Sequence, residues 1–434
     1  MSKVEMMSAK GKKKGALVPH LRFPEFRDAG EWAKILLSKI AVPVSERATD
    51  EDTDDVLTLS AEHGVVAQSA YFGKKVAGDD VSRYIRIKNN DFVYNDRTTK
   101  LYKYGTIKRL SRHTHGIVSP IYKCFRFNDE EIPVFWEWYF ESGEHDAQLY
   151  SIINEGAKEG RFNIAIRQFL STHVYFPNKI EQQKIADCLS SLDERIAAEA
   201  NKLDALKAHK SGLLKQLFPA EGETLPALRF PEFRSAGEWK KADFGNIAKF
   251  LSGGTPSKDV CDYWGGDIPW ISASSMHNIK IEKSDCNITK LAVSNGARIA
   301  PKGTLLLLVR GSMLHKRILL GISEIDVSFN QDVKALVLND DITELYLMYF
   351  LMASESKLLA TVVQTGIGAG KLDTDDLNNF PIMMPSPTEQ QRISNCLSSL
   401  DELITAQTQK IDLLKEHKKG LMQQLFPRID EVRA

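Results

Sequence analysis

Residues 180–219 read IEQQKIADCLSSLDERIAAEANKLDALKAHKSGLLKQLFP, and residues 388–427 read TEQQRISNCLSSLDELITAQTQKIDLLKEHKKGLMQQLFP. Apolar residues recur in both copies at the three- and four-residue steps of a heptad seam, which predicts two long helices. Each helix is expected to end at Pro219 or Pro427, because proline cannot continue a helix. The predicted spacer-helix seam consists of Ile185, Leu189, Leu192, Ile196, Leu203, Leu206, Leu213 and Leu217, then Ile393, Leu397, Leu400, Ile404, Ile411, Leu414, Leu421 and Leu425.

The seam is polar at Glu199 and Lys210 and again at Gln407 and Lys418. Polar seam residues cost stability but can fix the register and the partner of a helix. We therefore expect the two helices to pack on each other as an antiparallel coiled coil, a spacer between two globular heads. The alternative is that each helix packs only on the domain that precedes it.

A second block also occurs twice, as LRFPEFRDAGEW at residues 21–32 and LRFPEFRSAGEW at residues 228–239. The order of short block, variable insert and helix is thus repeated, which predicts a pseudo-twofold tandem repeat. A repeated frame with different inserts indicates one scaffold that carries two related but distinct binding functions; inserts that simply drifted are the alternative. The expected parts are a flexible N-terminal tail (1–20), a first domain (21–179), a first spacer helix (180–219), a second domain (220–387), a second spacer helix (388–427) and a C-terminal tail (428–434).

The inserts carry short apolar runs and turn signals, so the expected fold class is α+β, with two mixed α/β domains separated by the long helices. Strands are predicted at 92–94, 117–122, 268–271, 305–309 and 333–337, and helices at 136–140 and 345–359.

Charge is balanced overall, with 57 Lys and Arg against 57 Asp and Glu, which argues mildly against a lone high-affinity nucleic-acid binder. Its distribution is uneven. Residues 81–126 hold eleven basic and two acidic residues with interleaved tyrosines, and the matching residues 286–323 hold six basic residues and no acid. This pattern favours contact with phosphates and bases of nucleic acid, although a solvated basic face is the alternative.

Candidate DNA-binding residues follow from these basic stretches and from two glycine-flanked segments near them. The sequence does not decide which of them read bases and which hold phosphate. The candidates are Arg97, Lys100, Lys103, Lys108, Arg109, Arg112, Arg161 and Asn163 in the first insert, and Arg310, Ser312, His315, Lys316, Arg317, Gln364 and Lys371 in the second.

Several classes of function are disfavoured. The five scattered cysteines form no CxxC pair, which suggests reduced thiols in a cytoplasmic protein without a metal site. No apolar run approaches the roughly 18 residues of a membrane span. The GIGAGK segment at 366–371 lacks phosphate-loop spacing and follows a predicted helix, so we expect an ordinary loop there. With no catalytic motif found, the chain is expected to be neither an enzyme nor a holder of a cofactor.

The order of LRFPEF–GEW, insert and EQQ–LSSLDE helix, repeated once, resembles the specificity subunit of type I restriction–modification systems. Gly253–Gly254–Thr255–Pro256 and Ile268–Pro269–Trp270–Ile271 look like the opening of a target recognition domain in that family. The first insert lacks this opening, so its domain is expected to be of another sequence type.

The resemblance implies that each insert is a target recognition domain reading one half of an asymmetric bipartite site on double-stranded DNA. It implies a non-catalytic chain that recruits two methyltransferase subunits using S-adenosylmethionine, and restriction/translocase subunits using ATP and magnesium. The long helices and the LRFPEF segments are candidate docking surfaces, although Phe23, Phe26, Phe230 and Phe233 could equally staple the helix ends. The alternatives are a duplicated protein-binding adaptor without DNA specificity, or an enzyme with a degenerate motif.

Overall fold

The computed structural model describes residues 17–49, 56–74, 78, 80–99, 102–152, 162–366 and 368–427. Its contacts divide the chain into two compact units, one made of Met1–Glu199 with Lys410–Ala434 and the other of Ala200–Gln409. Each unit combines a β-rich domain with parts of two long helices, so the α+β prediction is confirmed. Of the predicted tails, residues 1–16 and 428–434 lie outside the described residues, whereas 17–20 are described and the Leu17 carbonyl accepts from the backbone N–H of Trp32 at 2.8 Å.

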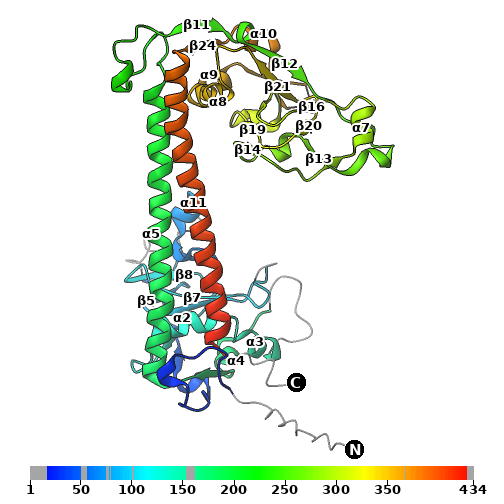
Figure 1. Cartoon of the computed structure of the whole chain (residues 1–434). Helices are drawn as coiled ribbons and strands as arrows, with labels where there is room; N and C mark the ends of the chain where they lie inside the picture. The colour runs from blue at the N-terminus through cyan, green and yellow to red at the C-terminus, as the bar shows by residue number, and fades with distance from the viewer. Residues whose placement is uncertain are drawn as a thin grey trace, which may run out of the picture. The chain divides into compact units, whose positions relative to one another are not determined.

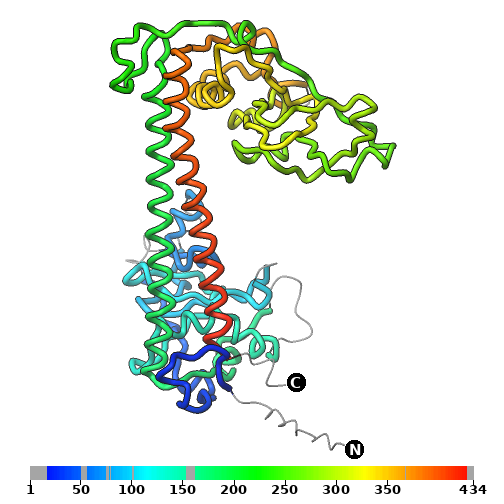
Figure 2. Tube along the Cα trace, in the orientation of Figure 1, coloured from blue at the N-terminus to red at the C-terminus, as the bar shows by residue number. Residues whose placement is uncertain are grey.

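The two long helices, α5 (Lys179–Leu217) and α11 (Pro387–Leu425), run antiparallel and pack side by side (Figures 1 and 2). All the predicted seam residues are buried or half-buried, while positions on the outer face, such as His209 and His417, are exposed. Burial of the apolar stripe explains why two such polar helices are stable in this arrangement.

The repeated LRFPEF block clamps the start of a long helix in each unit. In the first unit, Arg22 donates from Nε and Nη2 to the two carboxylate oxygens of Glu181 at 2.7 and 2.6 Å, and its Nη1 donates to the Gly30 carbonyl. The Arg22 and Glu181 side chains are only 6% and 1% exposed. The block and the EQQ motif are therefore one structural element.

The second unit repeats this clamp. Arg229 donates to both oxygens of Glu389 at 2.7 and 2.8 Å and to the Gly237 carbonyl at 2.7 Å. The indole N–H of Trp239 adds a longer bond to Glu389, at 3.3 Å. Sequence analysis missed these buried pairs, although both partners stand in the repeated blocks.

The end of the other long helix packs beside each clamp. The ring of Phe426, just past α11, lies 5.9 Å from that of Trp32, and the ring of Phe218, just past α5, lies 6.4 Å from that of Trp239. The backbone N–H of Leu21 donates to Gln424, and that of Leu228 donates to Gln216. Each unit thus holds the start of one helix and the end of the other.

The first unit's domain contains two four-stranded sheets and a short two-stranded one, β1 (Ala33–Leu36) with β10 (His173–Phe176). An aromatic core that includes Phe92, Phe125 and Trp136 lies between the four-stranded sheet that contains Phe92 and helix α2 (Pro133–Glu141). The sheets have the orders β2 (Ala41–Pro43), β9 (Lys123–Phe127), β6 (Phe92–Asn95), β7 (Thr106–Arg109) and β4 (Gly64–Ala67), β3 (Val56–Ser60), β8 (His115–Val118), β5 (Ile85–Lys88); the helices are α1 (Gln68–Phe72), α2 (Pro133–Glu141), α3 (Asp146–Ile152) and α4 (Ile166–Leu170).

The second unit's domain is built on a five-stranded sheet whose central strand β17 (Leu305–Leu308) is fully buried. The strand order of that sheet is β12 (Ala248–Ser252), β21 (Val333–Leu338), β17, β19 (Leu320–Ser323), β14 (Lys280–Ile281). A four-stranded sheet has the order β15 (Asn287–Ile288), β13 (Trp264–Ile271), β20 (Val327–Phe329), β16 (Ile299–Ala300), and a three-stranded sheet has the order β18 (Arg310–Gly311), β23 (Gly370–Leu372), β22 (Val362–Gln364). A two-stranded sheet pairs β11 (Lys240–Asp243) with β24 (Pro381–Met384). Its helices are α6 (Phe244–Ile247), α7 (Lys290–Ser294), α8 (Glu344–Ala353), α9 (Glu355–Ala360) and α10 (Thr374–Asn378).

Three local predictions were wrong in detail. The helix expected at 345–359 is broken at Ser354 into α8 and α9. The strand expected at 117–122 ends at Val118, where the chain turns. The GIGAGK segment follows strand β22 and not a helix. Its described residues form the turn of the β22–β23 hairpin and the start of β23. Short β-strands depend on partners far along the chain, which the local sequence pattern does not show.

Candidate nucleic-acid interface

The candidates of the second domain come together on the three-stranded sheet β18–β23–β22. Arg310 lies opposite Lys371 in this sheet, and Gln364 lies opposite Gly370. His315 follows in the 3₁₀ helix η7 (Ser312–His315), and its Nε2 is 3.0 Å from the carbonyl oxygen of Gly368. Two segments about fifty residues apart in the sequence thus form one basic surface.

Buried leucines hold this surface in place. Leu314 and Leu372 are 0% and 2% exposed, so their polar neighbours point outward. A Cβ atom at Gly370 would lie 3.0 Å from the Leu314 Cβ, which shows how closely the hairpin approaches η7. Arg310, Ser312, His315 and Gln364 are exposed, while Lys371 is half-buried and pairs with Asp373 at 2.8 Å.

Lys316 is also exposed, but Arg317 points to a different place. It lines a cavity of about 490 Å³ together with Lys215 of α5 and Glu355 of α9. Of the seven candidates in this domain, Arg317 is the one that the structure assigns to the side of the long helices.

In the first domain, a buried aspartate brings Arg97 beside Asn163. Asp96 is 0% exposed, and its carboxylate accepts from Lys123 at 2.6 Å and from the backbone N–H of Ile164 at 3.1 Å. Its carbonyl accepts from the backbone N–H of Phe162 at 3.3 Å. The exposed Arg97 and Asn163 are the chain neighbours of these bonded residues.

Lys103 lies near this pair, in the loop between β6 and β7, because the ring of its neighbour Tyr104 stacks 6.5 Å from that of Phe162. Burial raises the pKa of Tyr94, so its hydroxyl stays protonated and donates to the Tyr104 carbonyl at 2.9 Å. Gly105 closes the loop with φ +87°, and a Cβ there would lie 2.3 Å from the Asn95 carbonyl oxygen. We call Arg97, Lys103 and Asn163 the tip group. Two further candidates, Lys100 and Arg161, lie outside the described residues.

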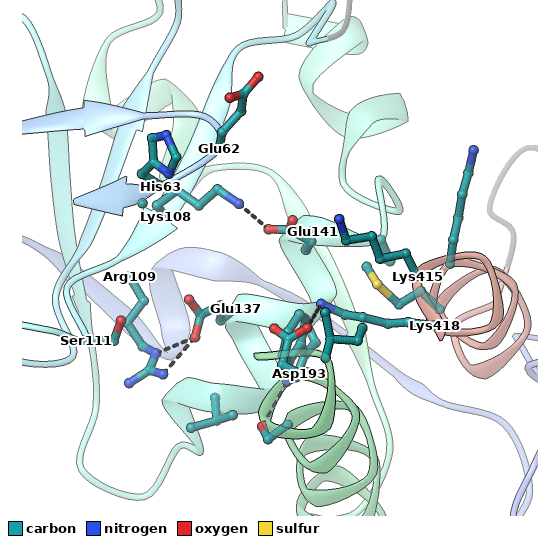
Figure 3. A pocket seen from close by; sticks show the side chains of 18 of the residues that line it. Glu62, His63, Lys108, Arg109, Ser111, Glu137, Glu141, Asp193, Lys415 and Lys418 are labelled. Atoms are coloured by element: carbon teal, nitrogen blue, oxygen red, sulfur yellow. Dashed lines mark hydrogen bonds and ion pairs between the residues drawn. The ribbon is translucent and has the colours of Figure 1, made fainter. Parts of the chain in front are cut away.

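The other three candidates of this domain lie elsewhere. Lys108, Arg109 and Arg112 line a cleft of about 970 Å³ that is bounded by the domain and by parts of α5 and α11 (Figure 3). We call them the cleft group. The β6–β7 register, Phe92 opposite Arg109 and Asn95 opposite Thr106, explains the separation, because Arg97 and Arg109 stand at opposite ends of one hairpin.

Acidic side chains offset the charge of two members of the cleft group, Lys108 and Arg109, whereas Arg112 is exposed. Lys108 forms an ion pair with Glu141, and Arg109 Nε donates to Glu137 at 2.8 Å (Figure 3). Both glutamates belong to α2, and the two basic side chains are only 12% and 14% exposed. A paired, half-buried cation offers less to a phosphate than the exposed members of the tip group.

The cleft also contains Lys415, Lys418 and Lys419 of α11, which sequence analysis treated only as parts of the spacer. Their spacing on a charged helix face gives no separate signal of a site. Among the described residues, no three His, Cys, Asp or Glu side chains gather so as to hold a metal ion. No helix in the described part of the chain is long and apolar enough to cross a membrane.

Comparison with known proteins finds a family match in the second domain and relatives over part of the chain. Residues 236–416 match the family model of the type I restriction modification DNA specificity domain. The chain is 32% identical over 174 residues to the EcoR124I/EcoR124II specificity subunit of Escherichia coli, covering 40% of this chain and 43% of that protein. It is 30% identical over 211 residues to the MjaIX specificity subunit of Methanocaldococcus jannaschii, covering 45% and 48%. The chain thus spans about half the length of these curated relatives.

Two solved structures share the fold over nearly the whole chain. One comes from work on complex assembly and conformational transition of the type I R-M system, with a TM-score of 0.56, 18% identity and coverage of 91% of this chain and 97% of that chain. The other is the S subunit of a type I restriction-modification system from M. genitalium, with a TM-score of 0.55, 15% identity and coverage of 95% and 99%.

Proposed function

We propose that this chain, which belongs to the family of type I restriction–modification specificity subunits, reads two separate halves of a DNA target for a methyltransferase. In this family the specificity subunit is not catalytic. One observation carries the proposal: the segment that matches the DNA specificity domain, 236–416, contains the basic sheet on which Arg310, Gln364 and Lys371 meet.

The two domains would read different half-sites. The first presents Arg97, Lys103 and Asn163 from a hairpin loop and its neighbour, and the second presents Arg310 and Gln364 from a three-stranded sheet. Arginine can bind guanine and amide side chains can bind adenine in the major groove. Because the two sets differ, the target should be asymmetric, and the long helices should set the gap between its halves.

Partners would supply the chemistry. We propose that two methyltransferase subunits, using S-adenosylmethionine, dock on the duplicated frame, and that restriction/translocase subunits using ATP and magnesium join them in the cytoplasm. The repeated clamps support two equivalent docking positions, since Arg22–Glu181 and Arg229–Glu389 order the same segment in each unit.

The direct test is a genome-wide map of methylated adenine in cells with the gene intact and deleted. We expect an asymmetric bipartite motif that is methylated only when the gene is present. Identical maps in the two strains, together with no binding of DNA by the purified chain and its methyltransferase, would instead favour the protein-binding adaptor.

Substitution of Arg310 by alanine should change or weaken recognition at one half-site only. Arg310 is exposed and belongs to the second domain alone, and loss of one base contact costs ~1–3 kcal/mol of discrimination. The methylation map of the variant shows this as relaxed bases on one side of the gap. Lys241→Ala, an exposed lysine on strand β11 outside this sheet, is the matched control. Equal relaxation of both halves contradicts the assignment.

Lys103 and Lys108 should differ in their effect on DNA binding. Lys103→Ala should reduce the slope of log binding constant against log salt concentration by about one, the value for one lost phosphate contact, because the Lys103 side chain is exposed in the tip group. The double variant Lys108→Ala/Glu141→Ala removes an ion pair without changing the net charge, and it should leave the dependence unaltered. Titration of the assembled complex with target DNA at several salt concentrations measures both. A larger change in the double variant would place DNA in the cleft.

A further inference from the structure

Each unit contains an ion pair between a lysine of one long helix and an aspartate of the other. In the second unit, Lys210 Nζ of α5 lies 2.6 Å from Asp401 Oδ1 of α11, with the two side chains 11% and 17% exposed. In the first unit, Lys418 of α11 pairs with Asp193 of α5. Lys210 and Lys418 are two of the four polar residues that the sequence places on otherwise apolar seams, the other two being Glu199 and Gln407.

Both pairs belong to one antiparallel register. Lys210 follows Asp193 by seventeen residues on α5, and Lys418 follows Asp401 by seventeen residues on α11. A slip of one helix against the other would therefore break both pairs together. It would also leave each of these partly buried lysines without its carboxylate, and a partly buried, unpaired charge is unfavourable.

An aromatic side chain joins each pair to the neighbouring β-rich domain. The Tyr349 hydroxyl of α8 donates to Asp401 Oδ2 at 2.7 Å, and Lys210 Nζ lies 5.3 Å from the centre of the Tyr349 ring. In the first unit, Lys418 Nζ lies 4.1 Å from the centre of the Trp138 ring of α2. The Trp138 indole N–H also donates to Ser190 of α5 at 3.3 Å.

In both units the lysine thus makes a cation–π contact with the neighbouring domain, and in the second unit the Tyr349 hydroxyl also donates a hydrogen bond to the aspartate. Net stabilisation by partly buried ion pairs is small, because desolvation offsets their attraction. Their directional requirement is strict, however, and single polar residues on apolar seams are known to select register. Positioning accounts for both pairs better than stability does.

We propose that Lys210–Asp401–Tyr349 and Lys418–Asp193–Trp138 are register locks. They hold α5 and α11 in one antiparallel register and fix where each β-rich domain attaches to the helix pair. Building on the proposed function, they make the chain accept one gap length between its two half-sites. Lys210, Asp401, Lys418 and Asp193 are positioning residues that touch no DNA.

The test exchanges the charges of one lock in the full-length protein with its methyltransferase. Lys210→Asp and Asp401→Lys each place like charges together, whereas the double variant Lys210→Asp/Asp401→Lys restores an opposite pair. The Tyr349 hydroxyl tolerates the exchange, because it can accept as well as donate. Lys202→Asp is the matched control on α5, since the Lys202 side chain is exposed and lies about two turns of the helix away from Lys210.

The first measurement is methylation of DNA targets whose half-sites are separated by gaps of different length. The preference is the ratio of methylation at the native gap to methylation at gaps one base pair longer or shorter. We expect this ratio to fall about tenfold in each single variant, because a factor of that size corresponds to the coupling between two charged groups in contact. The double variant and Lys202→Asp should keep the native preference. An unchanged preference in the single variants, or none recovered by the double variant, overturns the proposal.

The second measurement needs no DNA. Hydrogen exchange of residues 200–217 and 387–409 should accelerate in each single variant and return to the native rate in the double variant. Restored protection without any DNA recognition by the native protein would refute the proposed function and leave the helix register as inferred. Tyr349→Phe should keep the helix protection and still weaken gap preference, which separates domain attachment from pairing of the helices.

Discussion

Substitution of Glu181 by alanine is expected to lower the free energy of unfolding of the first unit by ~3–5 kcal/mol. The carboxylate is 1% exposed and accepts two hydrogen bonds from Arg22. Its removal leaves the Arg22 guanidinium, itself 6% exposed, as a buried charge without its carboxylate. The same change at Glu389 should cost at least as much, because the Trp239 indole would also lose its acceptor.

Urea unfolding gives the overall change, and native-state hydrogen exchange shows which unit it affects. Glu25→Ala is the control, because Glu25 pairs with Lys184 at the surface, where an ion pair contributes ~1 kcal/mol or less. The double variant Arg22→Met/Glu181→Leu should recover most of the loss, since it removes the buried charge as well. A loss below ~1 kcal/mol in Glu181→Ala would mean that the clamp is not a buried charge pair in solution.

These clamps show how a repeat can be visible in a sequence while its physical role is not. The identity of LRFPEF at two places indicates that the segment matters twice, but Arg22 and Glu181 are 159 residues apart. No local pattern pairs them. The aromatic residues Phe23 and Phe230 are the obvious candidates in these blocks. The nearly buried side chain in each copy is instead that of the preceding arginine, Arg22 or Arg229.

The long helices could be predicted because their signal is local and repeated: a seam with a period of 3.5 residues, closed by proline, is a property of consecutive residues. The β-rich domains could be assigned only to a class. Strand β13, for example, pairs antiparallel with β15 and parallel with β20, and neither partner follows from composition. Non-local pairing of short strands is set by tertiary packing.

The candidate site was predictable to the same degree. The basic run of the first domain predicts a set of DNA-contacting residues, yet a hairpin divides this set, so that Arg97 and Arg109 face different neighbours. In the second domain, the sequence placed Arg310 and Lys371 in one set without a reason for their proximity, and the pairing of β18 with β23 supplies that reason. Charge patterning selects candidate residues, and strand register decides which of them lie together.

Acidification from pH 7 to pH 5 should destabilise the first unit by ~2 kcal/mol through His145 alone. Burial lowers the pKa of His145 to about 3. Its Nε2 lies 3.1 Å from the Thr172 hydroxyl, which itself donates to the Phe169 carbonyl, so Nε2 carries the proton of the neutral ring. The buried Nδ1 has no hydrogen-bond partner within the described structure, and a second proton there would be an uncompensated charge.

The unfolded chain binds this proton near the ordinary histidine pKa of ~6.5, whereas the folded chain binds it only near pH 3. This contribution to stability is therefore present above pH ~6.5 and is lost as the pH falls through the window between these values.

His145→Gln keeps a donor toward Thr172 but cannot titrate, so its unfolding free energy should fall by ~2 kcal/mol less than that of the native chain between pH 7 and pH 5. Urea unfolding of both proteins at the two pH values measures the difference, in which the shared contribution of carboxylates cancels. Equal losses in the two proteins would show that His145 is not buried as a neutral ring, and that the aromatic core around it, with Phe140 at 5.2 Å and Phe169 at 5.6 Å, admits water.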